Sequence, residues 1–362
     1  MRTCLIYTLL CLSLFSACRK TEGINTDGNA RLSFSFDTVL FDTVFTAFGS
    51  TNKRIKVYNR DARILNISDI SLGGGDQSFF SLIVNGEAAN NAKAIRVLGN
   101  DSISIFIKVT INPNNSNQPF IVEDSIIFNT NGNRQAVRLI AYGQNAVFLN
   151  NLTLENNTTF TPALPYIVNK NLTVPDGISL NILPGTKVLF HGNATMHVKG
   201  SLKVQGNVYN PVLFASDRTE PFYENESGQW SGIRFYPESI NSTINYATIK
   251  NAVIGISSDS LSLNELPKLL LTNTVVKNMS IAGFTGYHTS LKGFNNLFYN
   301  CGQYLVYGIG GGSYDLKHNT FAGYNPAFGR KTPALYFSDL HQAQSFPLSI
   351  DIKNNLICLI CK

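Results

Sequence analysis

Charged residues are scarce in this sequence. Lysine, arginine, aspartate and glutamate make up 14% of its 362 residues, against about 25% in an ordinary globular domain. The 29 basic and 23 acidic residues give a net charge of +6, yet lysine and arginine never form a run. A protein that grips nucleic acid needs a basic stripe to neutralise the phosphates. The sequence therefore excludes that class.

Uncharged polar residues take the place of the missing charges. Asparagine, serine, threonine, glycine and tyrosine are frequent, with 28 glycines and 15 tyrosines. This mixture suits strands and turns and disfavours long helices. The composition therefore predicts an all-β protein.

The apolar run at the start of the chain is too short to span a bilayer. It extends from Leu5 to Phe15 after Arg2 and ends in Ser16-Ala17-Cys18, the three regions of a secretory signal peptide. The small pair before the cysteine resembles a bacterial lipobox. That resemblance implies that residues 1–17 are a lipoprotein signal peptide and that Cys18 is lipidated. An ordinary cleaved signal, with Cys18 uninvolved, is the alternative.

Cysteine is also sparse. Beyond Cys18 and the signal peptide, Cys301, Cys358 and Cys361 remain, which does not constitute a disulfide framework. Cys358 and Cys361 form a C-x-x-C pair without a second pair or a nearby histidine. We interpret these cysteines as small buried hydrophobic residues rather than redox or zinc ligands.

Two strand patterns divide the rest of the chain. Residues 18–30 are polar and predict a flexible tether. Residues 31–148 alternate apolar and polar positions between Gly- and Asn-rich turns, as in Ile103, Ile105 and Ile107, which predicts a β-sandwich. The segments 55–59, 67–70 and 101–107 resemble the immunoglobulin-like domains that precede β-helices in bacterial surface lipoproteins.

Residues 149–362 contain short strands that end in Gly, Pro or Asp about every eight residues, such as 172–174, 180–182 and 188–190. The strings at 184–190 and 198–206 resemble the opening coils of right-handed parallel β-helices of the pectin-lyase-like fold. The resemblance implies a solenoid over this whole segment.

An internal repeat independently predicts stacked coils. An apolar-x-Asn-x-apolar pattern recurs at intervals of 22 and 23 residues. Stacked amides could bond one another along the coils. The interval from 318 to 354 is 36 residues, so we expect an inserted loop within 324–347, a position where specificity commonly resides. The predicted structural ladder comprises Asn251, Asn273, Asn296, His318 and Asn354.

Residues for catalysis are not evident. Lyases of the resembled fold need a calcium-binding carboxylate cluster and a base, and its hydrolases need clustered aspartates. We interpret His191, His197, His288 and His318 as structural or surface residues. The sequence predicts no catalytic residue, metal ligand or cofactor. Four acidic residues of the second half, namely Asp217, Glu220, Glu224 and Glu226, lie close together in the sequence. We interpret them as solvated charges of one loop rather than as a cation site.

Aromatic residues are the remaining candidates for binding. Flat rings can stack on sugars while neighbouring amides and hydroxyls bond the sugar hydroxyl groups. Ordinary stacking inside the coils is the competing interpretation. The candidate glycan-binding residues are Phe222, Tyr223, Trp230, Tyr236, Tyr304, Tyr307 and Tyr314.

The sequence thus favours a lipid-anchored envelope protein whose β-helix binds a glycan or another envelope protein without catalysis. A polysaccharide lyase or glycoside hydrolase of the same fold is the alternative, and a structural adhesin is the third possibility. The expected location is the outer membrane, on its periplasmic or surface face. The expected partners are the membrane, through the lipid, and a polysaccharide or envelope protein, without nucleic acid.

The last recognisable coil, residues 352–357, is followed at once by Cys358 and Cys361 without a polar cap. Because an uncovered coil exposes unpaired backbone groups, we expect this chain to be truncated or its end to be covered by a partner.

Overall fold

The computed structural model of the chain describes residues 23–46, 49–50, 52–323 and 330–358. These residues form strands, turns and two short 3-10 helices, η1 (Gly75–Gln77) and η2 (Pro221–Tyr223), and none of them lies in an α-helix. The all-β prediction is therefore confirmed. No helix in the described part is long and apolar enough to cross a membrane. The predicted signal peptide and the lipidation site Cys18 lie outside the described residues.

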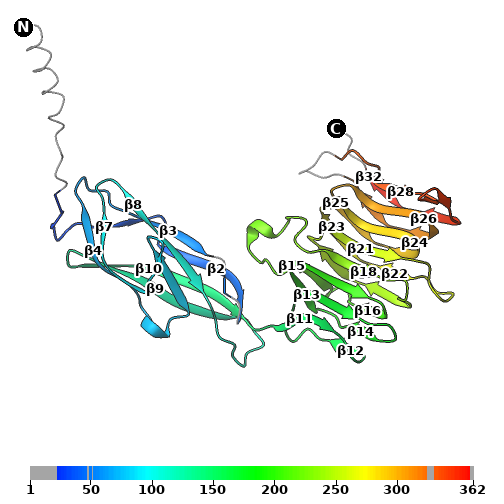
Figure 1. Ribbon diagram of the computed structural model, residues 1–362, viewed down its shortest axis with the longest axis horizontal. Helices are drawn as coiled ribbons and strands as arrows, with labels where there is room; N and C mark the ends of the chain where they lie inside the picture. The colour runs from blue at the N-terminus through cyan, green and yellow to red at the C-terminus, as the bar shows by residue number, and fades with distance from the viewer. Residues whose placement is uncertain (1–22, 47–48, 51, 324–329, 359–362) are drawn as a thin grey trace, which may run out of the picture. The chain divides into compact units, whose positions relative to one another are not determined.

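The chain divides into two units, residues 1–113 with 119–143 and residues 114–118 with 144–362. The boundary predicted at 148/149 falls inside the first strand of the second unit, β11 (Val147–Thr153). We describe the two units separately (Figure 1).

The first unit is an antiparallel, sandwich-like arrangement of two five-stranded sheets of the immunoglobulin-like type, as predicted (Figure 1). The sheet orders are β1-β3-β8-β5-β6 and β2-β10-β9-β4-β7. The strands are β1 (Ser33–Phe34), β2 (Thr38–Phe45), β3 (Lys53–Tyr58), β4 (Leu65–Leu72), β5 (Phe80–Val84), β6 (Glu87–Ala88), β7 (Asn91–Val97), β8 (Ser102–Val109), β9 (Phe120–Thr130) and β10 (Asn133–Gln144).

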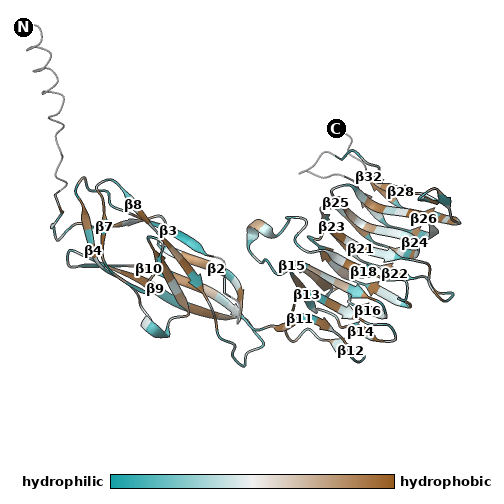
Figure 2. Ribbon diagram, in the orientation of Figure 1, coloured by the Kyte–Doolittle hydropathy of each residue, from teal (hydrophilic) through white to brown (hydrophobic). Residues whose placement is uncertain are grey.

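Alternation along the strands builds one core between these sheets. Ile105 and Ile107 of β8 and Val137 and Leu139 of β10 are fully buried and belong to the same hydrophobic cluster, although they come from different sheets. Apolar residues recur along the strands of this unit in Figure 2. Since successive side chains of a strand point to opposite faces, every second residue enters the core.

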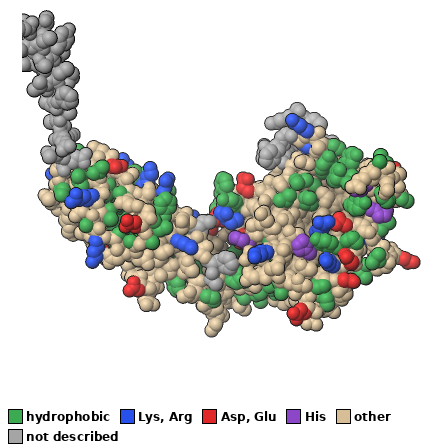
Figure 3. All heavy atoms as spheres, viewed as in Figure 1, with side chains coloured by type: hydrophobic (Ala, Val, Ile, Leu, Met, Phe, Trp, Pro, Cys, Tyr) green, Lys and Arg blue, Asp and Glu red, His purple; other side chains and the backbone are tan. Residues whose placement is uncertain are grey.

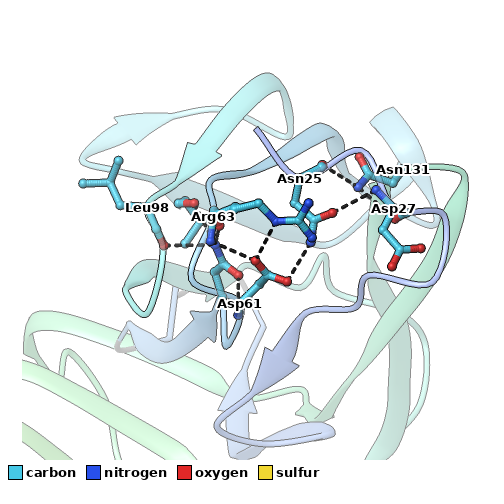
Figure 4. Close-up of polar contacts among 8 residues, drawn as sticks. Asn25, Asp27, Asp61, Arg63, Leu98 and Asn131 are labelled. Carbon is cyan, nitrogen blue, oxygen red and sulfur yellow. Dashed lines mark hydrogen bonds and ion pairs between the residues drawn. The ribbon is translucent and has the colours of Figure 1, made fainter. Parts of the chain in front are cut away.

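The segment predicted as a flexible tether is fixed in its described part, residues 23–30. Asn25 is only 1% exposed. Its Nδ2 donates to Asp61 Oδ2 at 2.8 Å, and Asn131 Nδ2 donates to its carbonyl oxygen at 2.8 Å (Figure 4). Hydrogen bonds from the Arg63 backbone N–H and side chain hold the pKa of Asp61 below its usual value. Polar composition suggested a solvated chain, but here asparagine side chains add specific bonds to the backbone pairing of Ile24 with Ile64.

The second unit is a large, 20-stranded sheet of parallel pairs. Its strands up to β19 are β11 (Val147–Thr153), β12 (Thr158–Phe160), β13 (Tyr166–Val174), β14 (Ser179–Ile182), β15 (Lys187–Val198), β16 (Ser201–Gln205), β17 (Val212–Ser216), β18 (Gly232–Phe235) and β19 (Ser242–Asn245). They continue as β20 (Ala247–Lys250), β21 (Ile254–Asp259), β22 (Leu269–Thr272), β23 (Val275–Met279), β24 (Ala282–Phe294), β25 (Leu297–Cys301), β26 (Tyr304–Lys317), β27 (Thr320–Ala322), β28 (Leu335–Phe337), β31 (Leu348–Lys353) and β32 (Leu356–Cys358). A separate antiparallel hairpin is formed by β29 (Leu340–His341) and β30 (Gln344–Ser345).

The parallel pairs follow three series, named here A, B and C. Series A runs through the second half of β15, then β18, β21, the first half of β24, the first half of β26 and β28 (Figure 1). Series B runs through β12, β14, β16, β19, β22, the second halves of β24 and β26, and β31. Series C runs through the first half of β15, then β17, β20, β23, β25, β27 and β32.

In-register apolar side chains form the core of this unit. Along series A, Met196, Ile233, Ile256, Phe284 and Val306 occupy matching positions, and each is at most 1% exposed. Parallel strands lie about 4.8 Å apart, so matching side chains stack directly on one another. The short strands predicted between residues 172 and 214 all lie within observed strands.

The predicted structural ladder is divided among three positions. Asn273, His318 and Asn354 directly follow series B strands and have positive φ angles of 50°, 57° and 55°, a backbone conformation that asparagine tolerates better than most residues. Asn296 comes one residue later than the position that matches these three, and its side chain is buried. Asn251 follows a series C strand instead, in register with Asn278 and Asn300.

Loop length explains the mistaken register. Ala247 and Thr274, which occupy matching positions, are 27 residues apart because loop 260–267 lengthens this turn of the chain. The 22-residue interval from Asn251 to Asn273 therefore joins two different series. The 36-residue interval was interpreted correctly, because Lys317 pairs with Lys353.

A column of matching positions runs through Thr274, Asn296, Asn319 and Asn355, and the first three of these residues are buried. Asn319 Oδ1 accepts from both the backbone N–H and Nδ2 of Asn296, at 3.0 and 2.9 Å. Asn355 Oδ1 accepts in the same way from Asn319, at 2.7 and 3.0 Å. Each buried amide is thus satisfied by its neighbour, which removes the cost of burying it alone.

Candidate functional site

A pocket of about 570 Å³ opens on the outward face of series A. Its volume falls within the range of small-molecule sites, about 300–1,000 Å³. Aromatic and apolar walls combine with charged and hydrogen-bonding groups. The lining residues are Arg234, Pro237, Asp259, Ser260, Tyr287, His288, Ile309, His341 and Phe346.

Strand register places three of these residues side by side. Asp259, Tyr287 and Ile309 pair across β21, β24 and β26. They alternate with buried residues such as Ser258, so their side chains point away from the core. Tyr287 is 39% exposed and offers the largest accessible aromatic surface in the pocket.

The inserted segment supplies another part of the lining, through His341 and Phe346. Within the 36-residue interval, hairpin β29–β30 carries His341, whose ring lies 4.5 Å from the Tyr287 ring at a steep angle. Phe346 follows the hairpin, and its ring lies 5.0 Å from that of His288. His288 Nδ1 lies 2.8 Å from the Gly310 carbonyl oxygen, which can only accept, so Nδ1 carries the proton.

Glycines in the middle of β26 let this insertion pack closely against that strand, where Gly311 N–H donates to the Ser338 carbonyl oxygen and Gly312 N–H to that of Pro347. Gly310, Gly311 and Gly312 have φ angles of 68°, 72° and 112°. A Cβ at Gly312 would stand 2.2 Å from the Thr289 carbonyl oxygen. Side chains are excluded there on both conformational and steric grounds.

An ion pair borders the pocket. Arg234 donates from Nε and Nη2 to Asp259 Oδ2, at 3.0 and 2.8 Å, and this bond raises the pKa of the guanidinium. The guanidinium carbon also lies 4.8 Å from the centre of the Tyr236 ring. The Arg234 side chain is 49% exposed and that of Asp259 21%, so the pair contributes little to stability but holds both side chains in defined positions.

Neighbouring groups orient Tyr236. Its hydroxyl lies 2.9 Å from His197 Nδ1, while His197 Nε2 lies 3.2 Å from Asn171 Oδ1. Burial, and then the charges of Arg234 and Lys199, lower the pKa of His197. A neutral histidine with its proton on Nε2 satisfies both contacts, accepting from Tyr236 and donating to Asn171.

The seven aromatic residues predicted from the sequence have different fates. The prediction is wrong for Trp230 and Tyr314, which are 0% and 1% exposed and belong to the core. Trp230 stacks on Phe190 at 4.0 Å and 6°. Tyr314 packs on Phe337 at 4.7 Å, where burial strongly raises the pKa of its phenol.

Tyr304 and Tyr307, two more of the predicted residues, form a column of rings next to the pocket together with Tyr336, which the sequence did not single out. Tyr307 lies 4.6 Å from Tyr304 and 5.3 Å from Tyr336, whose ring is nearly parallel to it. Burial, followed by the two neighbouring phenols, raises the pKa of Tyr307. These rings stack on one another outside the core, since Tyr336 is 40% exposed.

Phe222 and Tyr223 lie away from this face, in the loop between β17 and β18. Phe222 is 74% exposed. The Arg218 guanidinium carbon covers Tyr223 at 3.7 Å from the ring centre. The Asn251 side chain holds this loop, because its Nδ2 donates to the carbonyl oxygens of Tyr223 and Glu224 at 2.9 and 3.0 Å.

Two of the four acidic residues of that loop, Asp217 and Glu220, are paired with basic side chains. Glu220 accepts from Arg218 at 3.0 Å, and Asp217 Oδ2 lies 2.7 Å from His191 Nδ1. Burial raises the pKa of Asp217, and the bond to His191 opposes that shift. Within the described ranges, no group of three or more His, Cys, Asp or Glu side chains is placed to hold a metal ion.

The cysteine interpretation holds for Cys301, which is fully buried. Burial raises the pKa of its thiol to about 12, so it remains protonated. Cys358 is exposed and free. Cys361 lies outside the described residues.

The sequence reasoning missed the pocket. It treated His288 as structural and did not single out Tyr287, Asp259 or His341. The available signal was the 36-residue interval, which marked the insertion that carries His341. On the face drawn in Figure 3, charged side chains are scattered among uncharged ones, so charge alone marked no site.

No family model and no curated protein matches the chain. Similar solved structures include the ASH/PapD-like domain 7 of human CEP192, with a TM-score of 0.22, 8% identity and coverage of 36% of this chain and 95% of that one. The periplasmic chaperone SfaE has a TM-score of 0.22 and 11% identity, over 32% of this chain and 58% of the chaperone. A family 123 glycoside hydrolase from Clostridium perfringens has a TM-score of 0.23 and 13% identity, over 33% and 30% of the two chains. Similarities of this size carry no argument about function.

Proposed function

We propose that the second unit is a right-handed parallel β-helix that binds a glycan in the pocket beside Tyr287, without cleaving it. We further propose that the chain is held on the outer membrane through lipid on Cys18. The three series of parallel pairs, with matching residues such as Lys292 and Asp315 about one turn of chain apart, support the β-helix.

The observation that carries the binding proposal is the pocket formed by Tyr287 and the insertion. Sugar rings bury their C–H faces against aromatic side chains, while their hydroxyl groups need donors and acceptors. Tyr287 and Phe346 provide the first kind of surface, and Asp259, Arg234 and His341 provide the second. Insertions in repeat architectures commonly form the binding face.

Affinity electrophoresis tests this proposal. The protein should migrate more slowly in gels that contain one member of a panel of laminarin, xylan, mannan and polygalacturonate. Tyr287→Ala should weaken that retardation at least tenfold, because it removes the central ring of the pocket. Tyr299→Ala, an aromatic substitution on series C, should leave it unchanged.

Other outcomes separate the alternatives. New reducing or unsaturated ends in the gel polysaccharide would indicate a glycoside hydrolase or lyase. Retardation that Phe222→Ala abolishes and Tyr287→Ala preserves would place binding at the loop between β17 and β18. Equal retardation of wild type and Tyr287→Ala would contradict the proposed site.

A further inference from the structure

A buried lysine lies directly behind the pocket. Lys268 precedes β22 and is 0% exposed, one of the largest fully buried side chains among the described residues. Burial lowers the pKa of its ammonium group, while the carboxylates of Glu238 and Asp259 act in the opposite direction. Asp259 also lines the pocket, so the lysine charge interacts with one residue of the site.

The Lys268 ammonium group is saturated with backbone acceptors. Its Nζ donates to the carbonyl oxygens of Tyr236, Pro237 and Ser239, at 3.3, 2.7 and 2.9 Å. The same turn is closed by a bond from Ser239 N–H to the Tyr236 carbonyl oxygen at 3.0 Å. An ammonium group has three protons to donate, and this turn accepts all three.

That turn carries two parts of the site. Pro237 lines the pocket, and the Tyr236 ring supports the Arg234 guanidinium at 4.8 Å. On the other side, the Lys268 backbone N–H donates to Ser290 Oγ at 2.8 Å. Lys268 therefore joins the corner after β18 to the strand that follows loop 260–267.

An apolar side chain of the same size would not carry the cost of burying a charge. Moving an ammonium group out of water costs several kcal/mol, which its bonds only partly offset. A methionine would avoid that cost but would leave the positions of the three carbonyl groups unspecified. A fixed position of the turn, needed by the site, would explain why the chain bears the cost of burying the Lys268 ammonium group.

We propose that Lys268 is a positioning residue for the pocket, which fixes the turn 236–239 so that Tyr236, Pro237 and Arg234 hold the shape that a glycan requires. This inference rests on the proposed function. It assigns to Lys268 a role in binding that is separable from its contribution to stability.

The test compares Lys268→Met with Leu180→Ala, a core substitution in β14 that is also fully buried. Both variants are first melted, and binding is then measured well below both midpoints with the same four polysaccharides. We expect Lys268→Met to weaken retardation at least tenfold, as Tyr287→Ala does. Leu180→Ala should lower the melting temperature and leave retardation unchanged.

Hydrogen exchange at the Ser239 amide gives a second readout without polysaccharide. It should accelerate at least tenfold in Lys268→Met and stay unchanged in Leu180→Ala, because only the first loses the bonds that fix the turn. If Lys268→Met does not fold, Lys268→Gln, which retains two donors, replaces it.

The outcomes are distinguishable from a failure of the proposed function. Wild-type retardation that is lost in Tyr287→Ala but kept in Lys268→Met would overturn the positioning role and leave the proposed function intact. If no polysaccharide retards the wild type, unchanged exchange at Ser239 would overturn the positioning role as well, and accelerated exchange would support it.

Discussion

Trp230→Ala is expected to lower the free energy of unfolding of the second unit by about 3–5 kcal/mol, the usual cost of removing a buried tryptophan. The indole is 0% exposed and stacks on Phe190 at 4.0 Å. Its Nε1–H donates to the Lys250 carbonyl oxygen at 2.8 Å, so the substitution also leaves that carbonyl without its partner. For a unit of this size the melting temperature should fall by roughly 10 °C.

Phe222→Ala is the matched control. The sequence suggested the same role for both rings, but Phe222 is 74% exposed at the tip of its loop, and its removal should change stability by less than about 0.5 kcal/mol. Calorimetry on the two variants decides the matter. Equal melting temperatures for Trp230→Ala and Phe222→Ala would contradict the buried position of Trp230.

The second large effect is expected for Asn319→Ala, at about 2–5 kcal/mol. Asn319 is 1% exposed. It accepts two bonds from Asn296, donates to Asn355 Oδ1 and donates to the Gly293 carbonyl oxygen at 3.1 Å. Alanine would leave buried donors and acceptors on both sides unpaired, each costing about 1–3 kcal/mol where it cannot relax.

Asn295→Gly is the control for this column. Asn295 precedes the buried position by one residue, has a φ of 54° and makes an exposed bond to Asn273 at 2.7 Å. Glycine accepts that backbone conformation, so we expect a loss below about 1 kcal/mol. Urea unfolding measures both losses. A larger loss of stability for Asn295→Gly than for Asn319→Ala would contradict the buried column and would favour the position of Asn273, which the sequence predicted.

Alternation in the sequence was sufficient to predict the strands. Ile105 and Ile107, like Val137 and Leu139, enter the core because a strand has a fixed period of two. Turn residues about every eight positions located the short strands between residues 172 and 214. These features depend on neighbouring residues only, so a single sequence contains them.

Direction and register depend on parts of the chain that are far apart. Trp230 lies just before β18, and only its packing on Phe190 of β15 shows that it points inward. The predicted register of the amide ladder was wrong for a related reason. The long loop 260–267 changes the number of residues between matching positions. Local spacing cannot reveal which of three series a residue joins.

The pocket escaped the sequence for the same reason. Asp259 and Tyr287 are 28 positions apart along the chain and meet only through the pairing of β21 with β24. His341 comes from a hairpin that folds over them. The sequence predicted the existence of the insertion, and the structure was needed to show which face it covers.

Hydrogen exchange in the presence of a retarding polysaccharide tests the central claim most directly. Amides of 285–288 and 340–346 should become protected when laminarin, xylan, mannan or polygalacturonate binds, because Tyr287 and the insertion both line the pocket. Protection of these two segments, absent in Tyr287→Ala, is the result that the account predicts. Protection confined to residues 218–228, with 285–288 and 340–346 unchanged, would contradict it.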